Sequence, residues 1–203
     1  SFGAYYDSEP VVSPDGARIF LSDVNGVVRV FAVEKDRKVS PLHSIGLPDA
    51  NAPLRKAEIP AGIAVSADSR KIYVALNLSN RVAEMDAATG QLLRTWNVGV
   101  DPFAVVRAGQ KLYVSNWGGR RPDAQSVTGP AGKGTQVRVD PVRHIASEGS
   151  VSVIELGEDK SEIRNAKSEI LTGLHASAMT LAPNGRHLVV ANAGSDTLSV
   201  IDT

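Results

Sequence analysis

The sequence has no cysteine, and this absence removes several classes of function at once. Disulfide frameworks, thiolate metal sites and cysteine nucleophiles all require that residue. Long apolar runs are also missing: no stretch approaches the ~18 residues of a membrane-spanning helix, so we expect no membrane span. Neither sign of charge is in excess, because 22 lysines and arginines balance 22 aspartates and glutamates. Without a net field, the chain is not expected to bind nucleic acid.

Catalytic and metal-binding motifs are equally scarce. The histidines form no H-E-x-x-H pair, so no metal site is predicted. The stretch TGPAGKGTQ is glycine-rich, but Gly134 follows Lys133 where a phosphate-binding loop needs Ser or Thr. G-x-S-x-G and S-x-x-K are absent. We expect no cofactor and no catalysis by this chain alone, and catalytic residues stay unassigned. The scattered carboxylates, which give no acid and base pair, include Asp7, Glu9, Glu58, Asp101 and Glu148.

What the sequence does contain is a repeated unit. Its 203 residues are 42% hydrophobic, enough to bury a core in one domain or a fragment of one. Copies begin with VVSPDGARIFLSDV, IAVSADSRKIYVAL, FAVVRAGQKLYVSN and MTLAPNGRHLVVAN. The third copy is interrupted and resumes at GSVSVIEL. Within a single domain at 1–203, the predicted units lie near 11–39, 60–98, 102–172 with an insertion at 118–148, and 174–203.

Each unit reads as a series of short strands separated by turns. Segments such as Pro14–Gly16 and Pro183–Gly185 supply the backbone conformations of tight turns. Runs such as Ile72–Ala75 are rich in Val, Ile and Tyr and too short for helices. Four-stranded meanders repeated about 40 residues apart are typical of a β-propeller. We therefore predict an all-β fold, a β-propeller of four-stranded antiparallel blades with about four blade units present.

The repeats also resemble a known family. YVAL, YVSN and VVAN follow the strand-and-turn motif of the bacterial YVTN-repeat β-propellers. EIPAGIAVSADSRKIYVALN, YVSNWGGRRP and VRVDPVRHIASEGSVSVIEL resemble the subgroup in which the propeller precedes an alkaline-phosphatase-like phosphoesterase domain. The resemblance implies about seven blades, a periplasmic or extracellular location, and an attached phosphoesterase domain that these residues do not include. Closure would then require further sequence, an outer strand from Phe2–Tyr6, or a second chain.

The insertion at 118–148 is the leading candidate for recognition. Loops of this length without secondary structure are uncommon unless they are functional or disordered. It is locally basic, and the preceding tryptophan offers an aromatic face beside guanidinium groups that suit carboxylates, phosphates or sugars. We expect an enlarged hairpin loop that projects from one rim; a plain structural loop is the alternative. One histidine outside the insertion precedes the innermost strand of the fourth unit. The candidate binding residues are Trp117, Arg120, Arg121, Arg143, His144 and His175.

Two other features are given structural interpretations. Glu34–Pro60 has mixed charge and four prolines, and we expect a solvated crossing between blades. Asn77, Asn116 and Asn192 recur after the second strand of their units, where we expect them to shape the turn.

These observations favour a non-catalytic β-propeller module for ligand or protein recognition, within a larger secreted protein. Its partner would be a protein or a small anionic ligand, and possibly an attached phosphoesterase domain. The alternatives are the propeller portion of a phosphoesterase-type hydrolase, or a propeller of the lactonase-like or redox-subunit kind. Fold by itself does not decide among them.

Overall fold

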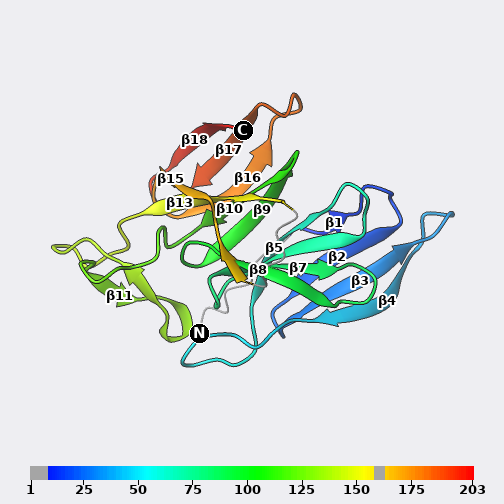
Figure 1. The fold of residues 1–203 in the computed structure, drawn as a ribbon, viewed down its shortest axis with the longest axis horizontal. Helices are drawn as coiled ribbons and strands as arrows, with labels where there is room; N and C mark the ends of the chain where they lie inside the picture. Colours follow the sequence, from blue (N-terminus) through cyan, green and yellow to red (C-terminus); the bar gives the residue numbers. More distant parts are fainter. Residues whose placement is uncertain (1–8, 158–162) are drawn as a thin grey trace.

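The computed structural model describes residues 9–157 and 163–203, and within them it is built from β-strands without an α-helix. Figure 1 shows successive sheets following one another along the chain. Sheet 1 contains β1 (Val11–Val12), β2 (Arg18–Asp23), β3 (Val27–Val33) and β4 (Val39–Gly46). Sheet 2 contains β5 (Pro60–Val65), β6 (Lys71–Leu76), β7 (Arg81–Asp86), β8 (Leu92–Asn97) and β14 (Ile163–Asn165).

The later part of the chain continues the same pattern. Sheet 3 contains β9 (Pro102–Ala108), β10 (Lys111–Asn116), β13 (Gly149–Glu155) and β15 (Ser168–Thr172). Sheet 4 contains β16 (Ala176–Leu181), β17 (His187–Asn192) and β18 (Thr197–Asp202). All neighbouring strands are antiparallel except β14, which runs parallel to β8. The predicted all-β class with four-stranded antiparallel sheets is therefore confirmed. The expected contribution of Phe2–Tyr6 lies outside the described residues.

The core lies between successive sheets. Because side chains alternate across a strand, each inner sheet can bury both of its faces. Phe20 and Val30 of sheet 1 pack in one cluster with Ile72 of sheet 2, while Tyr73, on the opposite face of the same strand, packs with Leu112 of sheet 3. A third cluster joins sheets 3 and 4. The first strands β5, β9 and β16 also contact one another in order, which places their preceding loops at a common rim.

The first sheet differs from the sequence prediction at its outer edge. Glu34–Pro60 was expected to be a solvated crossing, yet it contains β4, which pairs along β3. Sheet 1 consequently extends to Gly46, past the predicted end of the unit at residue 39. The strand is mostly exposed and contains Pro41, so it has little of the apolar pattern that marks a strand in sequence. The β4 residues have little strand propensity of their own, and they form a strand because they pair with β3.

The insertion at 118–148 is folded and does not form an open projecting loop. Its hairpin joins β11 (Thr128–Pro130) to β12 (Gln136–Arg138) through a 3-10 turn at Gly132–Gly134. Val137 and Val139 form a small buried cluster with Val100, which precedes β9. At the tip, the Leu54 N–H donates to the carbonyl of Lys133 at 3.1 Å. The insertion thus runs from sheet 3 to the connection between sheets 1 and 2.

The recurring asparagines do not occupy one equivalent position. Asn116 and Asn192 are the last residues of β10 and β17, whereas Asn77 comes one residue after β6, where Leu76 ends the strand. Asn116 Nδ2 donates to the hydroxyls of Ser150 and Ser152 at 3.0 and 2.9 Å. Asn192 Nδ2 makes the matching bonds to two hydroxyls of β18. These two asparagines tie second strands to third strands, so the expected turn-shaping role is corrected for them.

Candidate functional site

The rim loops of sheets 2, 3 and 4 share a backbone arrangement that positions the site. The residue before each first strand, namely Ile59, Asp101 or His175, offers its carbonyl to the N–H of a residue that follows the second strand. The donors are Asn77, Trp117 and Ala193, at 3.0, 3.0 and 3.1 Å. The repeat therefore places Asp101 and Trp117 side by side on sheet 3. It places His175 at the corresponding position of the next sheet.

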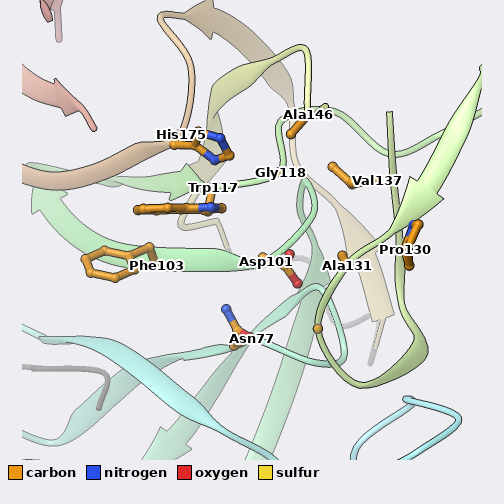
Figure 2. Close-up of a pocket in the computed structure, with 11 residues that line it drawn as sticks. Asn77, Asp101, Phe103, Trp117, Gly118, Pro130, Ala131, Val137, Ala146 and His175 are labelled. Carbon is orange, nitrogen blue, oxygen red and sulfur yellow. The ribbon is translucent and has the colours of Figure 1, made fainter. Parts of the chain in front are cut away.

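A cavity of about 450 Å³ lies at this rim, and we call it the Trp117 pocket (Figure 2). The insertion forms one wall and the rim loops form the other. Figure 2 shows Trp117 beneath the imidazole of His175, with Asn77 and Asp101 on the opposite side of the indole in that view. The lining residues are Asn77, Asp101, Phe103, Trp117, Gly118, Pro130, Ala131, Gly132, Val137, Ala146 and His175.

Aromatic rings dominate the centre of the pocket. The centroid of the Trp117 ring lies 4.7 Å from that of His175, with the planes tilted by 47°. Phe103 approaches the same indole at 6.1 Å between centroids. Trp117 remains 37% exposed despite these contacts, so part of its surface is available to a ligand. The indole thus bridges sheets 3 and 4 and also lines the pocket.

Asp101 places a carboxyl at the edge of this aromatic surface. Its backbone is in the left-handed region with φ 51°, and its N–H donates to Asn80 Oδ1 at 2.9 Å. The side-chain atom Oδ1 is buried and accepts no hydrogen bond from the described residues. Burial raises the pKa of Asp101 to about 6, because the charged form loses its hydration. The carboxyl is therefore held ready to titrate near neutral pH.

The His175 imidazole also lines this pocket. Nδ1 is buried and has no partner among the described residues. Burial lowers the pKa of His175, opposed by a hydrogen bond to the backbone of Trp117. Because burial is the larger of these two effects, the neutral imidazole is favoured over the charged form.

The arginines of the insertion serve mainly intramolecular contacts. Arg120 donates to both carboxylate oxygens of Glu148, with Nε to Oε2 at 2.9 Å and NH2 to Oε1 at 2.6 Å. Arg121 Nε donates to the carbonyl of Val98 at 2.6 Å, and its NH2 donates to the carbonyl of Asn80. Burial lowers the pKa of Arg121, and the positive charge of Arg81 acts in the same direction. Both arginines line a separate pocket of about 360 Å³, which also includes Glu169.

The structure therefore brings together only part of the predicted set. Trp117 and His175 share the pocket, Arg120 and Arg121 lie beside the second one, and Arg143 and His144 are exposed and line neither. Sequence reasoning did not assign roles to Asp101 or Phe103. An alignment of the repeats at the residue before each first strand would have matched Asp101 with His175, and this was the available signal.

The described part of the chain has neither a metal-binding cluster nor a membrane-spanning helix. No group of three or more His, Asp or Glu side chains is arranged to hold a metal ion in residues 9–157 and 163–203. None of the described segments is a helix long and apolar enough to cross a membrane.

Comparison with known proteins supports the fold. No family model matches the chain, and none of the curated protein sequences matches it. Hydrazine synthase from Kuenenia stuttgartiensis superposes with a TM-score of 0.64 at 18% identity, over 100% of this chain and 49% of that one. A Bacteroides uniformis protein that is provisionally described as a 6-phosphogluconolactonase superposes with a TM-score of 0.50 at 15% identity, over 95% of this chain and 65% of that one. Both have propeller-type folds, so this chain is propeller-like. It spans 49% of the first neighbour and 65% of the second.

Proposed function

We propose that this chain is a non-catalytic recognition module that binds a small organic molecule in the Trp117 pocket. The observation that carries the proposal is the convergence of a partly exposed indole with the Asp101 carboxyl and the His175 imidazole as lining residues of one cavity. Ligand sites commonly combine an apolar, aromatic surface with a few converging polar groups, in volumes of about 300 to 1,000 Å³. The cavity is within this range.

The lining chemistry supports binding over covalent catalysis. Within the part of the chain that the structure describes, the lining residues offer amide, carboxyl and imidazole groups but no hydroxyl, thiol or amine nucleophile. A carboxyl and an imidazole can move protons, yet the Trp117 ring packs directly against His175 and occupies the space beside it. Binding requires only that these groups stay in place, and the backbone contacts at the rim hold both of them.

The proposal is tested by a ligand screen followed by fluorescence titration. The chain has two tryptophans, and Trp96 is 1% exposed, so a ligand in the pocket should change the emission of Trp117 alone. Trp117→Ala should abolish this signal and weaken binding, measured by calorimetry, whereas Arg143→Ala, at an exposed position, should bind normally. A ligand that binds Trp117→Ala as well as the wild type, or that is chemically converted, would contradict the proposal.

We also propose that the chain is part of a larger β-propeller of the YVTN-repeat kind. Leu198 and Val200 of β18 are 69% and 65% exposed. By strand register, the equivalent positions of sheet 3 are Val151 and Val153, which are 0% and 7% exposed because sheet 4 covers them. A further sheet over Leu198 and Val200 would complete the same packing, and a fourth strand paired with β18 would cover its open edge.

The native reading frame tests this second proposal. We expect it to encode further four-stranded repeats of the same pattern, an export signal, and a total of about seven blades. The narrower alternative, the propeller portion of a phosphoesterase-type hydrolase, predicts in addition a metal-binding hydrolase domain. A complete native protein equal to residues 1–203 would overturn the proposal of further repeats.

A further inference from the structure

The Asp101 carboxyl bears on the class of ligand. Asp101 lines the Trp117 pocket, and no described residue donates a hydrogen bond to its Oδ1. Once ionised, the carboxyl can only accept hydrogen bonds. A partly buried carboxylate that lacks a donor is unfavourable, so a ligand that donates to it gains affinity. The pocket therefore favours a ligand with N–H or O–H donors.

The charge of the lining residues narrows the class of ligand further. Among residues 9–157 and 163–203, no lysine or arginine lines the Trp117 pocket, and Asp101 is the acidic residue that does. A cationic donor would compensate the hydration that the carboxylate loses on burial. Hydrogen bonds between charged groups are also stronger than those between neutral groups. The faces of Trp117 and Phe103 attract cations through their ring electrons as well. An anion would meet the opposite conditions, with an unpaired carboxylate and the negative ring faces.

The second pocket offers little competing attraction for an anion. Arg120 is paired with Glu148, and Arg138 is paired with Asp123 at 2.8 Å. Arg121 directs its donors to backbone carbonyls. Glu169 also lines that pocket, and burial raises its pKa. The positive groups expected to bind an anion are therefore already engaged by the protein.

The apolar residues of the insertion indicate which further chemical group the ligand should have. Pro130, Val137 and Ala146 of the insertion face the rim across the pocket (Figure 2). This wall suits a hydrocarbon or aromatic group, whose burial stabilises a complex by about 25 cal/mol for each Å² of apolar area. The ligand is then amphiphilic, with a charged head at Asp101 and an apolar body against the insertion.

We propose that the Trp117 pocket binds a primary organic ammonium ion, with N–H groups donating to the Asp101 carboxylate and an apolar body packed against Trp117 and the insertion. This inference rests on the proposed function, because it names the ligand class of the same pocket. It replaces the small anionic ligand expected from the basic sequence of the insertion.

The test compares three probes of similar shape by isothermal titration calorimetry and Trp117 fluorescence. These are 2-phenylethylamine, its neutral analogue 2-phenylethanol, and the anion phenylacetate. We expect the amine to bind at least about tenfold more tightly than either analogue. Asp101→Asn should lower amine affinity about tenfold and leave 2-phenylethanol unchanged, with Arg143→Ala as the matched surface control. Equal binding of amine and alcohol, or an Asp101→Asn variant with full amine affinity, would overturn the ligand class.

A pH titration of the unmodified chain provides a second measurement that needs no variant. Among the described residues that line the pocket, Asp101 and His175 are titratable. Raising the pH from about 5 to about 7.5 ionises Asp101, and His175, whose pKa is lowered, is neutral at the upper end of this range, so amine affinity should rise several-fold while the alcohol is unaffected. An amine affinity independent of pH would count against the inference. If none of the probes binds or changes Trp117 emission, the proposed function itself fails together with the inference.

Discussion

Arg120 and Glu148 stand at the two ends of the insertion and join them through a bidentate ion pair. The guanidinium Nε and NH2 donate to Oε2 and Oε1 at 2.9 and 2.6 Å. The ion pair lowers the pKa of Glu148 and raises that of Arg120. It closes the folded segment that walls the Trp117 pocket, so the geometry of the pocket depends on a contact outside it.

Breaking this pair should loosen the insertion more than the sheets. Arg120→Ala and Glu148→Ala should each lower the unfolding free energy slightly, with a coupling of about 1 kcal/mol in a double-mutant cycle, because the pair is partly exposed. Amide hydrogen exchange should accelerate within 118–148 and stay unchanged in β6 and β10. Equal acceleration in the sheets would show that the pair supports the whole fold.

Arg121 should matter for stability where Arg143 does not. Arg121 joins the insertion to two carbonyls at the rim of sheet 2, whereas Arg143 is exposed. Arg121→Met keeps most of the hydrocarbon length but removes the side-chain donor of both carbonyls, of which that of Asn80 still accepts from the Val98 N–H. We expect a loss of about 1 to 2 kcal/mol in urea denaturation. Arg143→Met should stay within about 0.5 kcal/mol of wild type. Equal effects would refute a bracing role for Arg121.

Asp101 should make stability fall as the pH rises. Its folded-state pKa is about 6, above the usual 3.8, so the folded chain holds a proton that the unfolded chain releases between these values. The stabilisation is complete in acid and is lost as the pH rises through the folded pKa. Asp101→Asn cannot ionise, so from about pH 4.5 to 7.5 it should gain roughly 2 kcal/mol relative to wild type, measured by urea denaturation.

Asp123→Asn supplies the opposite control for that experiment. Hydrogen bonds from Ser126 and Arg138 lower the pKa of Asp123 to about 2, so its contribution is present above the usual value and is lost as the pH falls. This variant should lose stability relative to wild type as the pH rises from about 2 to about 4, between the folded and the usual pKa, and should then differ from wild type by a constant amount from about pH 4.5 to 7.5. A trend of the same sign in both variants would contradict the assignment for Asp101.

Gly62 should be intolerant of any side chain. A Cβ atom there would lie 2.6 Å from Ala104 Cα and 2.7 Å from Val105 N, where β5 approaches the backbone of β9. Because backbone atoms cannot move aside cheaply, Gly62→Ala should destabilise the chain by about 1 to 3 kcal/mol. Gly46→Ala is the matched control in β4, since a Cβ there meets nothing within 4 Å. Thermal denaturation of both variants distinguishes close approach from a general effect of glycine replacement.

Local features were readable in the sequence because they arise from neighbouring residues. Alternating Val, Ile and Tyr in stretches such as Ile72–Ala75, bounded by turn residues, predicted the strands and their repetition. The same reading missed β4, whose residues are mostly exposed and include a proline. It also misplaced Asn77 relative to Asn116 by one residue, because register depends on which residue of β5 or β9 lies opposite.

The sequence by itself determined the all-β class, the repeating unit and the place of the insertion, since periodicity and turn chemistry act over a few residues. Only the tertiary structure decided that the insertion folds back to Leu54, that Arg120 and Arg121 are engaged within the chain, and that Asp101 faces the same pocket as His175. Those relationships join residues dozens of positions apart. They depend on how sheets 2, 3 and 4 pack at their rim, and a pattern of a few neighbouring residues does not specify that packing.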